Sequence, residues 1–397
     1  MKNGKVKLTL ALLMIALSAV LVSAQSGSKG PAPSDEQVKT PHQSGGNAAE
    51  TPKPPFNVIL IGWDAVQRNH LKECISRNEV PNLMKLAKKG ALMQIDISTG
   101  ATDTKAGWTQ ILTGYDPERT GVYNNAKYQP IPEGYSIIER VENRFGPENI
   151  VTVFLAGKKN HVGARGPHIL MPPARKKAKP GAATDADFES RKIVEEGPVK
   201  NSTATKTIQE ATAEKSAEPA QAAPKKPGRQ MAGEPHYYAR LHADLFENGL
   251  GAADNVGPKA LEALDKYKDQ PFFFFVHFQE PDPQGHAKGE NSEEYTAGIM
   301  KDDQWLGEIV AKLKELDLYD KTRIYVACDH GFDEGLKSHK NAPYVFFATN
   351  DPMVGKAGDR KDLAPTILSR LGFDLSKIEP PLDGKPLLES KSEEPIW

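Results

Sequence analysis

Seven residues scattered along this 397-residue chain carry side chains that could do chemistry together. They are Asp64, Thr104, Asp282, His286, Asp329, His330 and His339. Four of the segments that contain them begin as apolar runs and end where the polar residue appears. Buried parallel strands have this pattern, and they deliver their last side chains to the carboxyl edge of a sheet. Three Asp, three His and one hydroxyl at such an edge suit two divalent metal ions, with the hydroxyl placed as a nucleophile.

Thr104 supplies the hydroxyl of this set. It begins a helix predicted over residues 104–112, and the N-terminus of a helix favours a phosphate or sulfate group. A free threonine is a poor nucleophile, and coordination to a metal is one way to activate it. Threonine is also common as a helix N-cap, but the accompanying Asp and His residues favour the nucleophile. Lys105 comes next and either supplies positive charge at the site or faces solvent.

Asp282 and His286 follow an apolar strand predicted over residues 272–278. Because Pro, Gln and Gly lie between or beside them, we expect a turn that lets both side chains converge on one ion. Asp329 and His330 end another apolar run, and the glycine after them permits a sharp exit from the strand. For either pair, the alternative is a turn aspartate beside an exposed histidine.

The other histidines have weaker support. His339 has little specificity of its own, and it gains weight because it comes next along the chain after Asp329 and His330. His161 and His168 could also reach the site. His277 lies inside an apolar strand and is interpreted as a core histidine.

The apolar runs alternate with helical stretches. Strands are predicted at residues 58–62, 92–97, 150–155, 272–278, 323–328 and 344–348. Helices are predicted at residues 82–89, 104–112, 257–268, 294–316 and 362–371. This alternation favours a mostly parallel sheet with helices on both faces. Together these elements predict one α/β catalytic domain over residues 56–390.

Two polar segments are unsuited to building a core. Residues 25–55 are rich in Ser, Gly, Pro, Gln and Lys and are predicted to be a disordered linker. A low-complexity insertion is predicted at about residues 171–235, where Phe188 is the only aromatic residue. We expect the insertion to form a long surface loop that interrupts the domain.

Residues 1–24 have the form of a secretory signal peptide. Lysines precede an apolar stretch over residues 8–22, and small residues precede a cleavage site after Ala24. An uncleaved membrane anchor is the alternative, although the apolar run is short for a membrane span. We therefore expect a secreted or periplasmic protein with no membrane span after cleavage.

Bulk charge and cysteine content exclude little. The formal net charge of -1 gives no reason to expect nucleic acid or an anionic membrane as partner. Cys74 and Cys328 are the only cysteines, and an exported protein could pair them or bury both as small apolar side chains. The sequence leaves that pairing and the oligomeric state open.

Several segments have the form of known motifs. They are TDT followed by ILTG, then LTGYDPERTGV, and near the C-terminus DLAPTILSRLGFD and LDGKPLL. In these motifs the chain resembles the alkaline phosphatase superfamily, in particular its type I phosphodiesterase/nucleotide pyrophosphatase and sulfatase-like branch. The resemblance implies an alkaline-phosphatase-like three-layer sandwich. It also implies one metal on Asp282, His286 and His339, another on Asp64, Asp329 and His330, and Thr104 as nucleophile and metal ligand.

These expectations define a function. We expect a secreted two-metal phosphoric ester hydrolase, acting on a small-molecule mono- or diester through a phosphorylated Thr104 that water then hydrolyses. The mixed Asp and His ligands favour zinc. A sulfatase-like enzyme is an alternative, although sulfatases carry a Cys or Ser at the position of Thr104 and bind one calcium through Asp and Asn. A non-catalytic metal-binding relative is another.

Overall fold

The computed structural model describes residues 51–170 and 229–389. The predicted signal peptide at residues 1–24 lies outside the described residues, as do residues 25–50 of the predicted linker. Residues 171–228 of the predicted insertion also lie outside them. No helix among the described residues is both long enough and apolar enough to cross a membrane.

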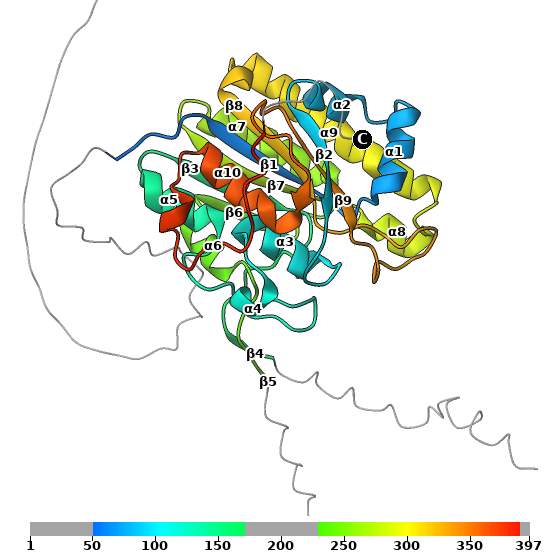
Figure 1. Ribbon diagram of the computed structural model, residues 1–397, viewed down its shortest axis with the longest axis horizontal. Helices are drawn as coiled ribbons and strands as arrows, with labels where there is room; N and C mark the ends of the chain where they lie inside the picture. Colours follow the sequence, from blue (N-terminus) through cyan, green and yellow to red (C-terminus); the bar gives the residue numbers. More distant parts are fainter. Residues whose placement is uncertain (1–50, 171–228, 390–397) are drawn as a thin grey trace, which may run out of the picture. The chain divides into compact units, whose positions relative to one another are not determined.

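An eight-stranded sheet forms the centre of the described structure (Figure 1), with the strand order β10-β2-β9-β8-β1-β7-β3-β6. Its strands are β1 (Asn57–Asp64), β2 (Ala91–Asp96), β3 (Val151–Ala156), β6 (Leu245–Asn248), β7 (Phe272–Pro281), β8 (Thr322–Cys328), β9 (Tyr344–Thr349) and β10 (Gly358–Asp359). Within this sheet only β9 runs against both of its neighbours, β2 and β8. The prediction of a mostly parallel sheet is confirmed.

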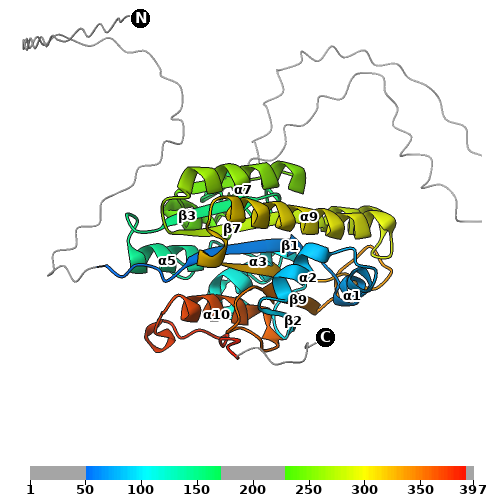
Figure 2. The ribbon, with the colours of Figure 1, turned by 90° about the horizontal axis from the view of Figure 1, so that it is seen from above.

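Helices cover both faces of this sheet, as Figure 2 shows from above. On one face α7 (Ala253–Tyr267) and α9 (Glu293–Glu315) pack against β7, and α1 (Arg68–Ser76), α2 (Pro81–Ala87) and α8 (Asp282–Lys288) pack against α9. On the other face α3 (Thr104–Thr113), α5 (Ile137–Phe145) and α10 (Leu363–Arg370) pack together, with α6 (Tyr237–His242) beside α5. This three-layer arrangement is the predicted α/β sandwich.

Short elements complete the described chain. They are the strands β4 (His168–Leu170) and β5 (Arg229–Met231), the helix α4 (Pro117–Thr120) and the 3-10 turns η2 (Tyr319–Lys321), η3 (Arg360–Asp362) and η4 (Leu375–Lys377). β4 and β5 pair antiparallel, with Leu170 opposite Arg229. Residues 229–231 thus form a strand within the insertion predicted at about residues 171–235, and residues 171–228 of that insertion lie outside the described part of the chain.

The strand β1 lies between β7 and β8 in the middle of the sheet. All eight residues of β1 are buried, as expected for a strand covered on both faces. A Cβ atom at Gly62 would lie 2.4 Å from the indole ring of Trp108. Only a glycine lets Trp108 of α3 pack directly on β1. This contact fixes how closely the helix that begins at Thr104 approaches the sheet.

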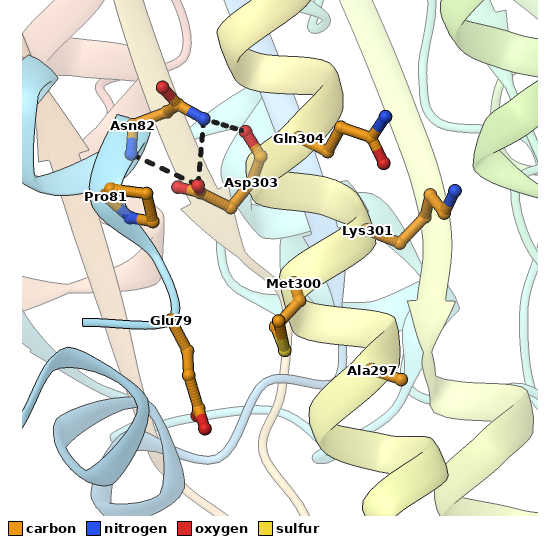
Figure 3. Close-up of a pocket in the computed structure, with 8 residues that line it drawn as sticks. All are labelled: Glu79, Pro81, Asn82, Ala297, Met300, Lys301, Asp303 and Gln304. Carbon is orange, nitrogen blue, oxygen red and sulfur yellow. Dashed lines mark hydrogen bonds between the residues drawn. The ribbon is translucent and has the colours of Figure 1, made fainter. Parts of the chain in front are cut away.

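The helix α2 is capped by a residue of α9 rather than by its own N-terminal side chain. The carboxylate of Asp303 accepts hydrogen bonds from the main-chain N–H of Asn82 at 3.1 Å and of Leu83 at 2.7 Å. The Asn82 amide also donates to Asp303 (Figure 3). A carboxylate at these open N–H groups satisfies them and complements the helix dipole.

The predicted strands and helices are all present within a few residues, and one local prediction was wrong. The expected turn between Asp282 and His286 is the helix α8. Cys74 and Cys328 are both buried, free thiols, so the two are not paired.

Candidate functional site

Neighbouring elements bring the predicted residues to one edge of the sheet. Asp64 ends β1, and Asp282 begins α8 directly after β7. Asp329 and His330 follow β8. Because β7, β1 and β8 are adjacent and parallel, their carboxyl ends meet, which is where open α/β folds hold their active sites. Thr104 begins α3 on one face of the same sheet.

One cluster of potential metal ligands consists of Asp282, His286 and His339. One ligand atom from each lies within 4.8 Å of the others. His286 Nε2 lies 3.3 Å from Asp282 Oδ1 and 3.2 Å from His339 Nε2. The helical turn of α8 places positions i and i+4 on one face, which is how Asp282 and His286 converge.

A second cluster consists of Asp64, Asp282 and His330, again with ligand atoms within 4.8 Å of one another. His330 Nε2 lies 3.6 Å from Asp64 Oδ1 and 3.6 Å from Asp329 Oδ2. The other oxygen of Asp329 accepts a hydrogen bond from the main-chain N–H of Ala65 at 3.1 Å. Asp282 thus belongs to both clusters, and Asp329 approaches the second one from the side of His330.

The three histidines of these clusters share one orientation. Each bonds through Nδ1 to a main-chain carbonyl: His286 to Lys337 at 3.0 Å, His330 to Gly331 at 2.9 Å and His339 to Thr102 at 2.5 Å. A histidine that donates from Nδ1 keeps the lone pair of Nε2 for a metal, and such outer contacts fix the ring. The donor atoms are therefore arranged as a metal site requires.

Three buried atoms of the predicted metal ligands have no hydrogen-bond partner among the described residues: Asp282 Oδ1, Asp329 Oδ2 and His330 Nε2. Buried acceptors without a partner are unfavourable. Divalent cations beside these atoms would satisfy them, so the residues present fit metal ions.

Thr104 is not the N-cap of its helix. Asp103 is the N-cap, and its Oδ1 accepts the main-chain N–H of Ala106 at 3.1 Å. The main-chain N–H of Lys105 donates to Asn125 Oδ1, and that of Gly107 donates to the Asp103 carbonyl. These donors are therefore already used within the chain, and the side chain of Thr104 is left for another role.

Lys158 is the main site residue that sequence reasoning missed. It follows β3, and its Nζ lies 2.7 Å from Asp64 Oδ1, 2.8 Å from Asp282 Oδ2 and 2.9 Å from Thr104 Oγ1. Burial alone would lower the pKa of Lys158, but the carboxylates of Asp64 and Asp282 raise it above its ordinary value. The sequence signal was present, because Lys158 follows an apolar run just as Asp64 does.

His277 has a role beyond the core position predicted for it. It is fully buried in β7, and its Nε2 lies 2.9 Å from Asp64 Oδ2. Burial lowers the pKa of His277, so a neutral ring donates from Nε2 and orients the Asp64 carboxylate. Its ring also packs edge-on against Trp108 of α3.

Lys105 does not face solvent. Its ammonium contacts Tyr128, whereas the ammonium of Lys158 contacts Thr104 Oγ1. The Lys105 side chain is buried, and its Nζ lies 4.4 Å from the centre of the Tyr128 ring. Burial lowers the pKa of Lys105.

His168 lies in β4 and bonds to the Gly166 carbonyl, and it belongs to neither donor cluster.

Close packing places Thr104's helix against the second cluster. A Cβ atom at Gly107 would lie 2.6 Å from Asp329 Cβ, so α3 touches Asp329 only because residue 107 is glycine.

A pocket of about 400 Å³ lies between α2 and α9 and contains none of the predicted site residues (Figure 3). The donor geometry, rather than this pocket, identifies the candidate site.

A family model described as type I phosphodiesterase / nucleotide pyrophosphatase matches residues 58–354. The chain belongs to this family. The matched residues include every predicted metal ligand and Thr104. The predicted resemblance to this branch of the superfamily is thereby confirmed, and the match includes the nucleophile motif and ends before the C-terminal motifs.

Three proteins that resemble this chain do so at low identity or over a short stretch. Human (Homo sapiens) ectonucleotide pyrophosphatase/phosphodiesterase family member 1 is 33% identical over 76 residues, which are 19% of this chain and 8% of that protein. Mouse (Mus musculus) bis(5'-adenosyl)-triphosphatase enpp4 is 21% identical over 299 residues, 74% of this chain and 50% of that protein. The chain thus spans half or less of the length of these relatives. The lipoteichoic acid synthase LtaP from Listeria monocytogenes superposes with a TM-score of 0.48 at 15% identity, over 85% of this chain and 76% of that one.

Proposed function

We propose that this protein is a metal-dependent phosphoric ester hydrolase in which Thr104 is the nucleophile. The observation that carries the proposal is the position of Thr104 Oγ1. It is 2.9 Å from Lys158 Nζ, which also contacts Asp64 and Asp282. A hydroxyl bonded to a buried cation that also contacts carboxylates of both clusters of potential metal ligands is in the setting that activates it as a nucleophile.

Two metal ions fit the residues present. One would be held by Asp282, His286 and His339, and the other by Asp64, Asp329 and His330 with Thr104 as a further ligand. The mixed nitrogen and oxygen donors favour zinc. When bound, such ions stabilise the attacking and leaving oxygens of an in-line displacement.

The chain's own residues would do the remaining work. Lys158 stabilises the Thr104 alkoxide and offers its ammonium to an oxygen of the substrate phosphate. His277 holds Asp64 in place, and the carbonyls behind His286, His330 and His339 fix their rings. Attack by Thr104 on phosphorus breaks the bond to the leaving group, which departs as an alcohol or a phosphate, and forms a phosphothreonine that still carries the second ester group when the substrate is a diester. Water then hydrolyses the phosphothreonine.

Membership in the phosphodiesterase/nucleotide pyrophosphatase family favours a phosphodiester or phosphoanhydride as substrate over a sulfate ester. One relative is named as a bis(5'-adenosyl)-triphosphatase, which points in the same direction. The substrate is therefore proposed to be a small molecule with an anionic phosphorus centre. Export through the signal peptide at residues 1–24 is part of the proposal, and a mature N-terminus at Gln25 in the exported fraction would support it.

A panel of three substrates tests this function: an aryl phosphodiester, an aryl phosphate monoester and an aryl sulfate, each with the zinc-loaded protein. We expect turnover of at least one phosphate ester and much slower turnover of the sulfate. Faster turnover of the sulfate would replace the proposal with a sulfatase-like activity. No turnover of any of the three by metal-loaded protein would favour a non-catalytic metal-binding relative.

A further inference from the structure

Arg360 is a fully buried arginine at the start of η3, and it lies behind the candidate site. Its guanidinium donates to the Asp329 carbonyl at 2.7 Å and to the Ala101 carbonyl at 2.7 Å. It also donates to Gln110 Oε1 at 2.5 Å and to the Thr99 carbonyl at 3.5 Å. One planar group therefore connects segments that are far apart in the sequence.

The acceptors of these bonds all belong to segments that carry site residues. Asp329 is a predicted metal ligand. The carbonyls of Thr99 and Ala101 lie in the loop that leads into Thr104, and Gln110 lies on the helix that Thr104 begins. The guanidinium thus spans the nucleophile segment and the metal-ligand segment at once.

The same loop also holds His339. The Thr102 carbonyl accepts from His339 Nδ1 at 2.5 Å, and the Thr102 hydroxyl donates to the His339 carbonyl. The loop is held on its other side by Gln110, whose amide donates to Thr99 Oγ1 at 3.0 Å. A shift of this loop would therefore move both Thr104 and His339.

Burying a guanidinium among neutral acceptors is unfavourable, because the charged group loses its hydration. All four of these hydrogen bonds go to carbonyl or amide oxygens, which repay the loss of hydration only in part. Burial lowers the pKa of Arg360 to about 10, so the group is still charged at neutral pH. Its rigid fork reaches several acceptors at fixed angles, which the single ammonium of a lysine does not.

We propose that Arg360 is a positioning residue that fixes the Thr104 loop relative to Asp329 and His339. This inference rests on the proposed function of the site. Its contacts are with the Asp329 carbonyl and with the loop and helix that hold Thr104, so it acts on the site through these segments.

Arg360→Lys and Arg360→Gln test the proposal, with Arg370→Lys as the matched control. Arg370 lies on α10 in the same C-terminal segment and donates to Asp351 at 2.7 Å. Turnover of the aryl phosphodiester is measured well below the melting temperature of each variant, with zinc saturating. Misplacing a nucleophile by about 1 Å costs on the order of 100-fold in rate. We therefore expect kcat to fall about 10- to 100-fold in both Arg360 variants, with KM little changed, and to stay near the wild-type value in the control.

Zinc affinity, measured by competition with a chelator, is the second readout and needs no activity. We expect about a tenfold loss of affinity in the Arg360 variants and none in the control. If the wild-type protein hydrolyses no ester, the proposed function fails and the zinc measurement alone decides the positioning role. If Arg360→Lys behaves as Arg370→Lys does in both readouts, Arg360 is only structural and the proposal is overturned.

A variant that leaves Arg360 in place guards against failure to fold. Gln110→Met removes the acceptor of the Arg360 Nε–H, together with the Gln110 bond to Thr99 Oγ1, while keeping the side-chain volume nearly constant. We expect a smaller loss of kcat and of zinc affinity in the same direction. Wild-type values of both in folded Gln110→Met and unchanged values in Arg360→Gln would together contradict the proposal.

Discussion

At the scale of single residues, the hydroxyl of Thr104 accepts a hydrogen bond from Lys158 Nζ and does not cap its helix. Asp103 is the cap of α3, so Thr104→Ala removes no capping bond and should lower stability only by about 1 kcal/mol, through the lost bond from Lys158. Removing a nucleophile abolishes the covalent route, so we expect kcat to fall about 10³-fold or more. Thr104→Ser keeps the hydroxyl and should retain substantial activity. The check is steady-state kinetics beside thermal melting, and near-normal turnover of folded Thr104→Ala would exclude the phosphothreonine.

Lys158 predicts a second effect, on stability. Lys158 Nζ is a buried cation that contacts the carboxylates of both Asp64 and Asp282 directly. Removing one partner of a buried ion pair costs about 3–5 kcal/mol. Lys158→Met should therefore destabilise chelator-treated protein strongly, and zinc-loaded protein much less, because metal ions replace the lost charge. Urea denaturation of both forms measures this difference. An equal loss in both forms would show that Lys158 does not share the carboxylates with metals.

The candidate site could be predicted residue by residue where metal-ligand chemistry is distinctive. Asp64, Asp282 and Asp329 were recognisable because each ends an apolar run, and the structure brings all three to one edge. Lys158 follows an apolar run as well, but a lysine is not a metal ligand, so the metal-ligand pattern does not place it in the site. The contact between His277 and Asp64 depends on the register of β7 beside β1, which the sequence alone does not specify.

At the scale of elements, α8 shows how composition can mislead. Pro and Gly between Asp282 and His286 favoured a turn, yet proline is well tolerated in the first turn of a helix. Gly285 serves packing, since a Cβ atom there would lie 2.6 Å from the Phe332 ring. The long apolar strands were predictable because their apolar composition alone indicates that they are buried. The local path at the sheet edge depends on tertiary contacts such as this one.

A contact between α5 and α6 should make the stability of the protein depend on pH. His242 of α6 bonds through Nδ1 to Glu142 of α5, and this bond raises the pKa of His242 above its ordinary value of 6.5. Protonated His242 binds Glu142 in the folded state, so its stabilisation is complete below pH 6.5 and is lost as the pH rises through the folded-state pKa. His242→Gln should therefore lower the free energy of unfolding at pH 5.5, by no more than about 1 kcal/mol, and have less effect at pH 9. His168→Gln is the control. If the difference in free energy of unfolding between wild type and His242→Gln were the same at both pH values, protonated His242 would not be the source of the stabilisation.

At the scale of the whole molecule, the two donor clusters predict a metal stoichiometry. Six predicted Asp and His ligands, with Thr104, are enough for two ions. Purified protein should contain close to two metal ions per chain, mainly zinc, and should lose its activity when they are removed by a chelator. Elemental analysis of the active protein measures both. Calcium alone, or active protein free of metal, would contradict the two-metal proposal.

The predicted insertion leads to a deletion experiment that the structure now defines more closely. Leu170 of β4 pairs with Arg229 of β5, so the ends of the segment 171–228 are adjacent. Two antiparallel strands can be joined by a two-residue Asn-Gly turn, and shortening a loop changes its closure entropy only slowly. We expect the domain with this replacement to fold, to keep its metals and to hydrolyse small esters at the normal rate.

The control is a longer deletion through residue 233, which removes β5 and Gly233, a glycine with a φ of +118°. That variant should be less stable, because β4 loses its partner. Soluble expression, melting temperature and metal content compare the two. If the shorter deletion were insoluble, the segment would be structural, and if it lost activity on large substrates alone, the segment would take part in binding them.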